Sequence, residues 1–218
     1  MIITIDGPAA AGKGTLASKL SKKYNLAYFD TGMVYRAVGL ELMLSGISPD
    51  DVEKATCFAQ KLTFQRMNEL SQHPEFRSAN GGKYASIVSS YPQVREALLH
   101  MQQNFAKNPV FADGRKADGA IYDGRDTGTV VCPQADIKLF ITASPEVRAE
   151  RRYFEFLSKG HQALYADVLE DIKARDKRDS ERATAPMKPA EDAVVFDTSE
   201  LSIDDVYQKA VEIIDSKQ

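Results

Sequence analysis

The stretch that decides the fold is "IITIDGPAAAGKGT", residues 2–15. An apolar, β-branched run comes first, then two glycines frame four residues, and a lysine follows the second glycine. A loop of this spacing between a strand and a helix wraps phosphate groups with its backbone N–H groups, and the positive end of the helix dipole adds attraction. The stretch therefore predicts an α/β fold with a nucleoside triphosphate site.

Lys13 is the residue of this loop that we expect to reach the β- and γ-phosphates. The common pattern has Ser or Thr directly after the lysine, but here Gly14 stands there and the hydroxyl comes one residue later, at Thr15. Thr15 is therefore a candidate metal ligand, either directly or through a water molecule. The alternative, a glycine-rich turn without a ligand, is disfavoured because the full spacing and both flanking elements are present.

Short apolar runs alternate with amphipathic helical stretches along the 218 residues. This alternation predicts a single domain built on a doubly wound parallel sheet with helices on both faces. Between about Leu62 and Asn80 the periodicity fails and turn formers are frequent, which predicts a loop or a small irregular lobe outside the sheet. The runs expected as strands are residues 2–6, 27–29, 120–123, 137–142 and 193–198, and the clearest helices are residues 13–24, 32–44 and 202–216.

Composition argues against several classes of protein. Hydrophobic residues make up 43% and charged residues 27%, as in ordinary globular proteins. A formal net charge of -3 argues against a general nucleic-acid binder. No secretory signal and no run of about 18 apolar residues is visible, so we expect neither export nor a membrane span. Cys57 and Cys132 are too few for a disulfide framework or a Cys-rich metal site, which fits a reducing cytoplasm.

Polar residues follow the second expected strand, at the edge where ligands bind in open α/β sheets. The run "FDTGMVYR", residues 29–36, places Asp30, Thr31 and Gly32 at the carboxyl end of that strand and Arg36 one helical turn later. These residues are candidates for an anion site. The alternative is an ordinary helix N-cap, formed by Asp30 or Thr31, followed by a solvated arginine.

The tripeptide "DGR" occurs twice, at residues 113–115 and 123–125. The second copy follows an apolar strand, so Asp123 would close that strand near the phosphates and is a candidate metal ligand. Arg125 and Asp126 would then project into the cleft. The first copy has a turn-like context and is interpreted as a surface loop.

Arg148, Arg151 and Arg152 share one face of an expected helix, because their spacing is i, i+3 and i+4. Like charges at this spacing repel, and a bound anion would remove the repulsion. The alternative is that Glu155 pairs with Arg151 and that the other two arginines are solvated.

Arg175, Asp179 and Arg182 share a face of a later helix, with Arg178 close by. Alone, such a segment is as readily a solvated, salt-bridged surface. Counted with the other arginines, it favours phosphoryl transfer, in which the protein mostly positions the reactants and neutralises charge. A GTPase-type switch needs fewer arginines, and the chain has no Asn-Lys-x-Asp run.

These residues resemble those of the bacterial cytidylate kinases. The resemblance covers nearly the whole chain and implies a P-loop kinase that moves the γ-phosphate of ATP to CMP or dCMP with Mg²⁺. It also implies a sheet core, a monophosphate-binding lobe at about 31–95 and a lid at about 148–165, in a cytoplasmic protein that we expect to be a monomer. The matching motifs are "ITIDGPAAAGKGT", "DTGMVYR", "YPQVREALL", "DGRDTGTVVCPQADIKLFITASPEVRAERR", "RDKRDSERATAP" and "LSIDDVYQKA".

The resemblance also implies roles for individual residues. ATP would be bound by Gly7, Pro8, Ala9, Ala10, Ala11, Gly12, Lys13, Gly14 and Thr15. The monophosphate would be bound by Thr31, Tyr35, Arg36, Ser86, Arg95, Arg125, Asp126, Arg175, Asp179 and Arg182. The residues expected to stabilise the transferred phosphoryl group are Lys13, Arg125, Arg148, Arg152 and Arg182.

Two segments depart from the family pattern. The segment before Glu75 is too short to hold all of the family's longer β-rich insert, and the segment before the second "DGR" is longer than usual. The short lobe keeps UMP or AMP open as acceptors. A nucleotide-binding regulator without turnover is the rival from another class, but it would leave the arginine clusters without an anion.

Overall fold

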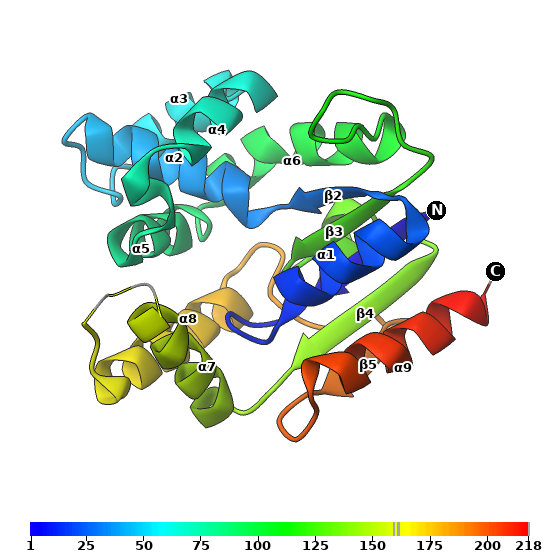
Figure 1. The fold of residues 1–218 in the computed structure, drawn as a ribbon. Helices are drawn as coiled ribbons and strands as arrows, with labels where there is room; N and C mark the ends of the chain where they lie inside the picture. Colours follow the sequence, from blue (N-terminus) through cyan, green and yellow to red (C-terminus); the bar gives the residue numbers. More distant parts are fainter. Residues whose placement is uncertain (159, 161, 218) are drawn as a thin grey trace.

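The computed structural model describes residues 1–158, 160 and 162–217. Over these residues the chain forms a five-stranded sheet in the order β2-β3-β1-β4-β5, and each neighbouring pair is parallel (Figure 1). The predicted doubly wound parallel sheet is therefore confirmed. The strands are β1 Ile2–Asp6, β2 Ala27–Asp30, β3 Ala120–Gly124, β4 Ile137–Thr142 and β5 Val194–Asp197.

The central strand is β1, whose Ile3 and Ile5 side chains are fully buried. It pairs with β3 on one side and β4 on the other, and its last residue, Asp6, lies opposite Gly124. The strand β2 pairs with the far side of β3. Because parallel strands end at the same edge, the loops that follow β1, β2 and β3 meet there, at the point where the strand order reverses.

Helices enclose both faces of the sheet (Figure 1). They are α1 Lys13–Tyr24, α2 Gly32–Leu44, α3 Val52–Lys61, α4 Phe64–Ser71, η1 Pro74–Arg77, α5 Ala79–Val88, α6 Pro92–Lys107, η2 Thr127–Val131, α7 Pro145–Ser158, α8 Tyr165–Glu181 and α9 Ile203–Asp215. One face packs on α1 and α9. The other face packs on α2 and α6, where Phe29, Phe105 and Tyr122 contact one another. Among the described residues no helix has the length and apolarity needed to cross a membrane.

The segment from 62 to 80 is helical, so the expectation of a loop or an irregular lobe between about Leu62 and Asn80 is wrong. It contains α4, η1 and the start of α5. Thr63 and Ser78 cap α4 and α5 by accepting hydrogen bonds from backbone N–H groups three residues later. These elements are too short to show a sustained helical repeat, yet they bury Met67 and Phe76 in the cluster that includes α2.

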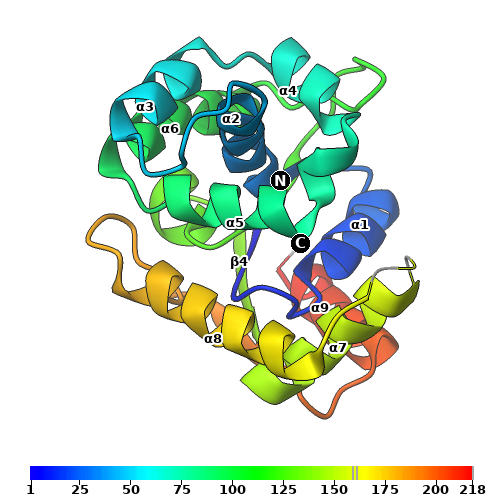
Figure 2. The ribbon, with the colours of Figure 1, turned by 90° about the vertical axis from the view of Figure 1, so that its left-hand side faces the viewer.

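The helices α7 and α8 form a separate pair that packs around Ala149, Val168 and Ile172. Figure 2 shows this pair beneath the group formed by α2 to α6. The lid expected at about 148–165 belongs to this pair, although residues 159 and 161 lie outside the described residues. A small apolar contact holds the pair together, whereas two large clusters hold the sheet.

The loop before β3 contains the first "DGR" copy, and the structure confirms that it is a surface loop. Val110 and Lys116 form an isolated antiparallel bridge at its base. Asp113 and Arg115 are exposed and pair with each other at 2.8 Å. This copy therefore lies apart from the carboxyl edge of the sheet.

Candidate functional site

A cleft of about 750 Å³ lies at the carboxyl edge of the sheet and receives side chains from α2, α5, α7 and α8. The predicted site residues that line it are Ala9, Ala10, Gly12, Lys13, Gly14, Thr15, Thr31, Tyr35, Arg36, Ser86, Arg95, Asp123, Arg125, Asp126, Arg152, Arg175, Asp179 and Arg182. The predicted residues Gly7, Pro8, Ala11 and Arg148 do not line it. Residues from both halves of the sequence therefore meet in one cavity.

Lys13 lies at the floor of the cleft, where α1 begins. Its Nζ donates a hydrogen bond to the carbonyl oxygen of Pro8 at 2.8 Å, which folds the side chain back across the loop. The side chain is only 5% exposed. Burial, together with the charge of Arg125, lowers the pKa of Lys13 to about 8, while Asp123 opposes this shift. A buried cation beside another cation is stabilised by a bound anion.

Gly7 begins the loop at a place where no side chain fits. Its φ is 141°, and a Cβ there would lie 1.9 Å from the carbonyl oxygen of Ile141 on β4. We expect Gly7→Ala to lower the free energy of unfolding by about 3 kcal/mol or more, because the clash is with backbone. The measurement is chemical denaturation followed by far-UV circular dichroism, since the chain has no tryptophan.

Gly12→Ala is the matched control for this prediction. Gly12 also has a positive φ, 93°, but a Cβ there would meet nothing within 4 Å. We expect a smaller loss of about 1–2 kcal/mol, from backbone strain alone. Equal losses in the two variants would contradict the close packing of the loop on β4.

Asp123 lies beside Lys13, with its Oδ1 3.7 Å from the lysine Nζ. Its Oδ2 accepts a hydrogen bond from the hydroxyl of Tyr28 at 3.4 Å. Burial raises the pKa of Asp123, and the positive charge of Lys13 opposes this effect. Thr15, two residues after Lys13, also lines the cleft. A carboxylate and a hydroxyl, both hard oxygen donors, thus lie next to the loop.

Asp126 sits between two arginines on the other side of the cleft. One of its carboxylate oxygens accepts a short hydrogen bond from Arg95 on α6, and the other lies 3.4 Å from Nη2 of Arg182. All three side chains are less than a tenth exposed. Arg95 also stacks over the ring of Tyr35, 5.3 Å from its centroid. The Asp126 carboxylate therefore pairs with the guanidinium groups of both Arg95 and Arg182.

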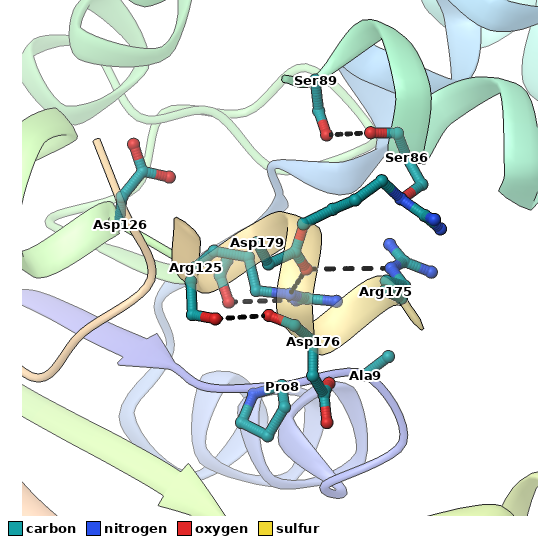
Figure 3. A network of polar contacts seen from close by, with 12 residues as sticks. Pro8, Ala9, Ser86, Ser89, Arg125, Asp126, Arg175, Asp176 and Asp179 are labelled. Atoms are coloured by element: carbon teal, nitrogen blue, oxygen red, sulfur yellow. Dashed lines mark hydrogen bonds and ion pairs between the residues drawn. The ribbon is translucent and has the colours of Figure 1, made fainter. Parts of the chain in front are cut away.

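Asp179 on α8 plays the same part for a second pair of arginines. Its Oδ2 accepts a hydrogen bond from Nε of Arg125 at 3.1 Å and lies 3.8 Å from Nε of Arg175 (Figure 3). Burial would raise the pKa of Asp179, but the arginines prevail and lower it. Four arginines are thus held by two carboxylates, and an excess of positive charge remains in the cleft.

Two of these arginines form their ion pairs through nitrogen atoms that make no hydrogen bond to any described residue. Nε of Arg175 and Nη2 of Arg182 are buried without a hydrogen-bond partner within the described part of the chain. Burial, with the neighbouring charge of Arg125, lowers the pKa of Arg175 to about 10. A buried donor without an acceptor is costly. Arg175 and Asp179 on α8 line the cleft, as does Arg182, which lies just past the end of the helix at Glu181, so the three do not share one helical face as predicted, and the alternative of a solvated, salt-bridged surface is wrong.

The three arginines of α7 do not gather around a single anion. Arg148 is 3% exposed and donates to Asp176 on α8 and to the carbonyl oxygen of Ala9. Arg151 points away from the cleft, toward Thr198. Arg152 alone lines the cleft.

Glu155 partners one of these arginines, but a different one from the alternative that the sequence left open. Arg152 donates to Glu155 at 2.7 Å and stacks on the ring of Phe156. Arg151 has Thr198 as its partner instead. Helical spacing shows which residues share a face, but it does not show that Arg148 and Arg151 find their partners on elements that are distant in the sequence.

The start of α2 forms the wall of the cleft beside β3. Thr31 stands at the N-cap but makes no cap hydrogen bond with its side chain, and its Oγ1 donates instead to the carbonyl oxygen of Asp123 at 2.9 Å. Asp30 accepts from the backbone N–H of Gly32. Arg36 is half-buried, and its Nη1 donates to the carbonyl oxygen of Phe76 at 2.9 Å. The N-cap residue Thr31 therefore does not cap α2 with its side chain, and Asp30, one residue earlier, accepts from the first residue of the helix.

Ser86 is buried on α5 and faces α8. Its Oγ accepts from Nε of Arg178 at 3.2 Å, and its carbonyl oxygen accepts from Ser89 at 3.0 Å (Figure 3). The hydrogen bond between Ser86 and Arg178 joins the two sides of the cleft.

Sequence reasoning missed other polar residues that line the cleft near Ser86, namely Arg77, Asn80 and Lys83. They lie in or near the segment that was expected to be irregular. The cap residue Ser78 was the available signal for a helix there.

Comparison with solved structures supports the fold. The protein is similar to an uncharacterized protein from Eubacterium ventriosum, with a TM-score of 0.53 and 15% identity over 99% of this chain and 98% of that one. It is also similar to shikimate kinase from Bacteroides thetaiotaomicron, with a TM-score of 0.51 and 13% identity over 99% and 98%. At these identities the likeness concerns the fold alone.

Comparison of sequences is more specific. The chain is 49% identical over 217 residues to a cytidylate kinase from Paramagnetospirillum magneticum, covering 100% of this chain and 99% of that protein. It is 46% identical to a cytidylate kinase from Rhodospirillum rubrum, covering 100% and 98%. The cytidylate kinase family model matches residues 3–216. With its phosphate loop and its arginines joined in one cleft, this chain belongs to the cytidylate kinase family.

Proposed function

We propose that the protein transfers the γ-phosphate of ATP to CMP or dCMP and releases ADP and CDP or dCDP. The observation that carries the proposal is the convergence of Lys13, Arg125, Arg175 and Arg182 on one cleft, in which two arginines have buried donor atoms that make no hydrogen bond to any described residue. Two phosphate-bearing ligands side by side would satisfy those donors. The family membership and the relatives named cytidylate kinase support the choice of acceptor.

The acceptor needs no general base, because its phosphate is already an anion. Catalysis then consists of holding donor and acceptor in line and neutralising charge on the oxygens of the transferred group. We assign the donor side to the loop from Gly7 to Thr15 with Lys13. We assign the acceptor side to Thr31, Tyr35, Arg36, Ser86, Arg95, Arg125, Asp126, Arg175, Asp179 and Arg182.

We propose for Arg148 a role different from the one that the family resemblance implies. Its guanidinium is occupied by the Asp176 carboxylate and by the Ala9 and Ala143 carbonyl oxygens. We propose that it fixes the loop against α8, whereas Arg152, which lines the cleft, meets the phosphates.

We propose that Mg²⁺ is bound together with ATP. Asp123 and Thr15 line the cleft and supply the carboxylate and hydroxyl oxygens that Mg²⁺ accepts. Among the described residues no group of three or more His, Cys, Asp and Glu could hold a metal ion, which fits an ion that takes water and substrate phosphates as its other ligands. When bound, the ion neutralises charge on the phosphates.

The remaining parts of the proposal concern organisation. The lobe at about 31–95 would hold the monophosphate, and the lid at about 148–165 would close over ATP to exclude water. We propose a monomer, because residues of one chain supply both sides of the cleft. We place the protein in the cytoplasm, where its two free cysteines would stay reduced.

The test is ADP release from ATP and Mg²⁺ with CMP, dCMP, UMP, AMP, GMP, dTMP or no acceptor. The expected result is turnover with CMP and dCMP well above that with every other acceptor. Preference for UMP or AMP would support the kinase activity but would contradict CMP and dCMP as the acceptors. Nucleotide binding without acceptor-dependent turnover would instead favour a regulator.

A further inference from the structure

The helix η2, which follows Asp126, begins with backbone N–H groups that no residue of the helix itself can satisfy. Such groups are usually capped by the side chain of the N-cap residue, and Asp is among the best cap residues. Here the N-cap residue is Asp126, but its side chain makes no cap hydrogen bond. Its carboxylate faces Arg95 and Arg182 instead.

Asp6, the last residue of β1, caps η2 from another strand. Its Oδ1 accepts from the backbone N–H and the hydroxyl of Thr127, each at 2.8 Å, and its Oδ2 accepts from the backbone N–H of Gly128 at 2.7 Å. The three donors need two acceptor oxygens, which a carboxylate has and a carboxamide lacks. Asp6 is 4% exposed, and burial raises its pKa to about 6, so the ionised form prevails at pH 8.

The turn is pressed tightly against its surroundings. A Cβ at Gly128 would lie 2.9 Å from Oγ1 of Thr4 and 3.4 Å from Oδ2 of Asp6. A Cβ at Gly124 would lie 2.6 Å from Oγ1 of Thr31 and 2.4 Å from Cγ2 of Thr127. The turn therefore has little room to move while the bonds to Asp6 remain.

We propose that Asp6 is a positioning residue of the acceptor side: it caps η2 in place of Asp126 and thereby leaves the Asp126 carboxylate free to hold Arg95 and Arg182 toward the monophosphate. This inference rests on the proposed function, because it assumes a monophosphate in that part of the cleft. Asp6 directly precedes the phosphate loop, a position that suggests a role in binding ATP. The proposal instead gives Asp6 a role in binding the monophosphate. Without the carboxylate of Asp6, Asp126 turns back to cap its own helix and releases the two arginines.

The first test is Asp6→Asn, assayed at pH 8 with CMP and ATP varied separately. We expect KM for CMP to rise by about tenfold and KM for ATP to change by less than about twofold, because the loosened turn holds acceptor ligands. The matched control is Asp136→Asn, at the opposite end of β1, where an exposed carboxylate accepts from the backbone N–H of Ile2 at 2.6 Å. Neither KM should change in the control.

A second test asks whether Asp6 acts through Asp126. In an Asp126→Asn background, adding Asp6→Asn should raise KM for CMP by less than about twofold further, because coupled residues are not additive. If Asp6 served only the stability of the fold, the full tenfold effect would appear in both backgrounds, and the proposal would be overturned.

A milder pair of variants covers the case in which Asp6→Asn fails to fold. Thr127→Val removes one of the three donors, and Thr127→Ser keeps it. By calorimetry, the Kd for CMP should rise by about threefold in the valine variant and return to the unaltered value in the serine variant.

The outcomes separate this inference from the proposed function. If the unaltered protein does not bind CMP, both are overturned. If it binds CMP and a folded Asp6→Asn protein binds CMP equally well, or loses CMP and ATP alike, only the role of Asp6 is overturned.

Discussion

Lys13→Ala is expected to abolish phosphoryl transfer to every acceptor, with a loss of at least about 1,000-fold in kcat/KM. The lysine is buried at the floor of the cleft, donates to the carbonyl oxygen of Pro8 and lies 3.7 Å from Asp123. We therefore expect its charge to act on the donor phosphates when ATP is bound. The measurement is the steady-state rate with CMP, dCMP and UMP, each at saturating ATP.

The control is Lys19→Ala, on the same helix. Lys19 is 40% exposed and pairs with Asp204 at 2.6 Å, far from the cleft. It should keep the rate of the unaltered protein, because exposed ion pairs contribute little to stability. A Lys13→Ala protein that kept a tenth or more of the unaltered rate would contradict the role given to the phosphate loop.

Arg182→Ala is expected chiefly to raise KM for the monophosphate, by roughly 30- to 100-fold, because a charged hydrogen-bonding group is lost from a buried site. The side chain is 4% exposed, its Nε donates to the carbonyl oxygen of Ala185 at 2.7 Å, and its Nη2 is buried without a hydrogen-bond partner within the described part of the chain. We expect KM for ATP to change by less than about threefold. Separate titrations of CMP and ATP measure the two effects.

Arg115→Ala is the matched control for this prediction. Arg115 is 73% exposed and pairs only with Asp113 among the salt bridges of the described residues. Neither KM should change. If Arg182→Ala left CMP use untouched, the part of the cleft at the end of α8 would not be the acceptor site.

The sheet could be predicted from the sequence because each strand carries its own signal. The run before Gly7 and the run at 137–142 are apolar and β-branched, and the helices between strands show an apolar face. The phosphate loop could be predicted because its chemistry is local: spacing, strand and helix all lie within 24 residues of the chain. These parts depend little on distant residues.

The short helices of the lobe and the side-chain partners within the site could not be predicted in the same way. The elements between 62 and 80 are short, so their apolar residues do not show a sustained helical repeat. The N-cap residues Thr63 and Ser78 were the sequence signals for these helices. The partners of Arg148 and Asp126 lie on elements that are distant in the sequence. A spacing of three or four residues shows which side chains share a face, but not what faces them.

The role of Asp6 could not be predicted for the same reason. In the sequence it looks like the end of a strand that leads into the phosphate loop. Its hydrogen-bond partners are 121 and 122 residues away along the chain. Only the register of β1 against β3, with Asp6 opposite Gly124, brings it to the turn that carries Asp126.

The central claim is that the protein transfers the γ-phosphate of ATP to CMP, and the most direct test follows that phosphoryl group. The protein is incubated with Mg²⁺, CMP and ATP that carries a radioactive γ-phosphate, and the products are separated. We predict that the label appears in CDP, with one labelled CDP formed for each ADP, and that no ADP forms in excess of CDP. Label that stayed in ATP, or that appeared only in inorganic phosphate, would contradict transfer to the monophosphate.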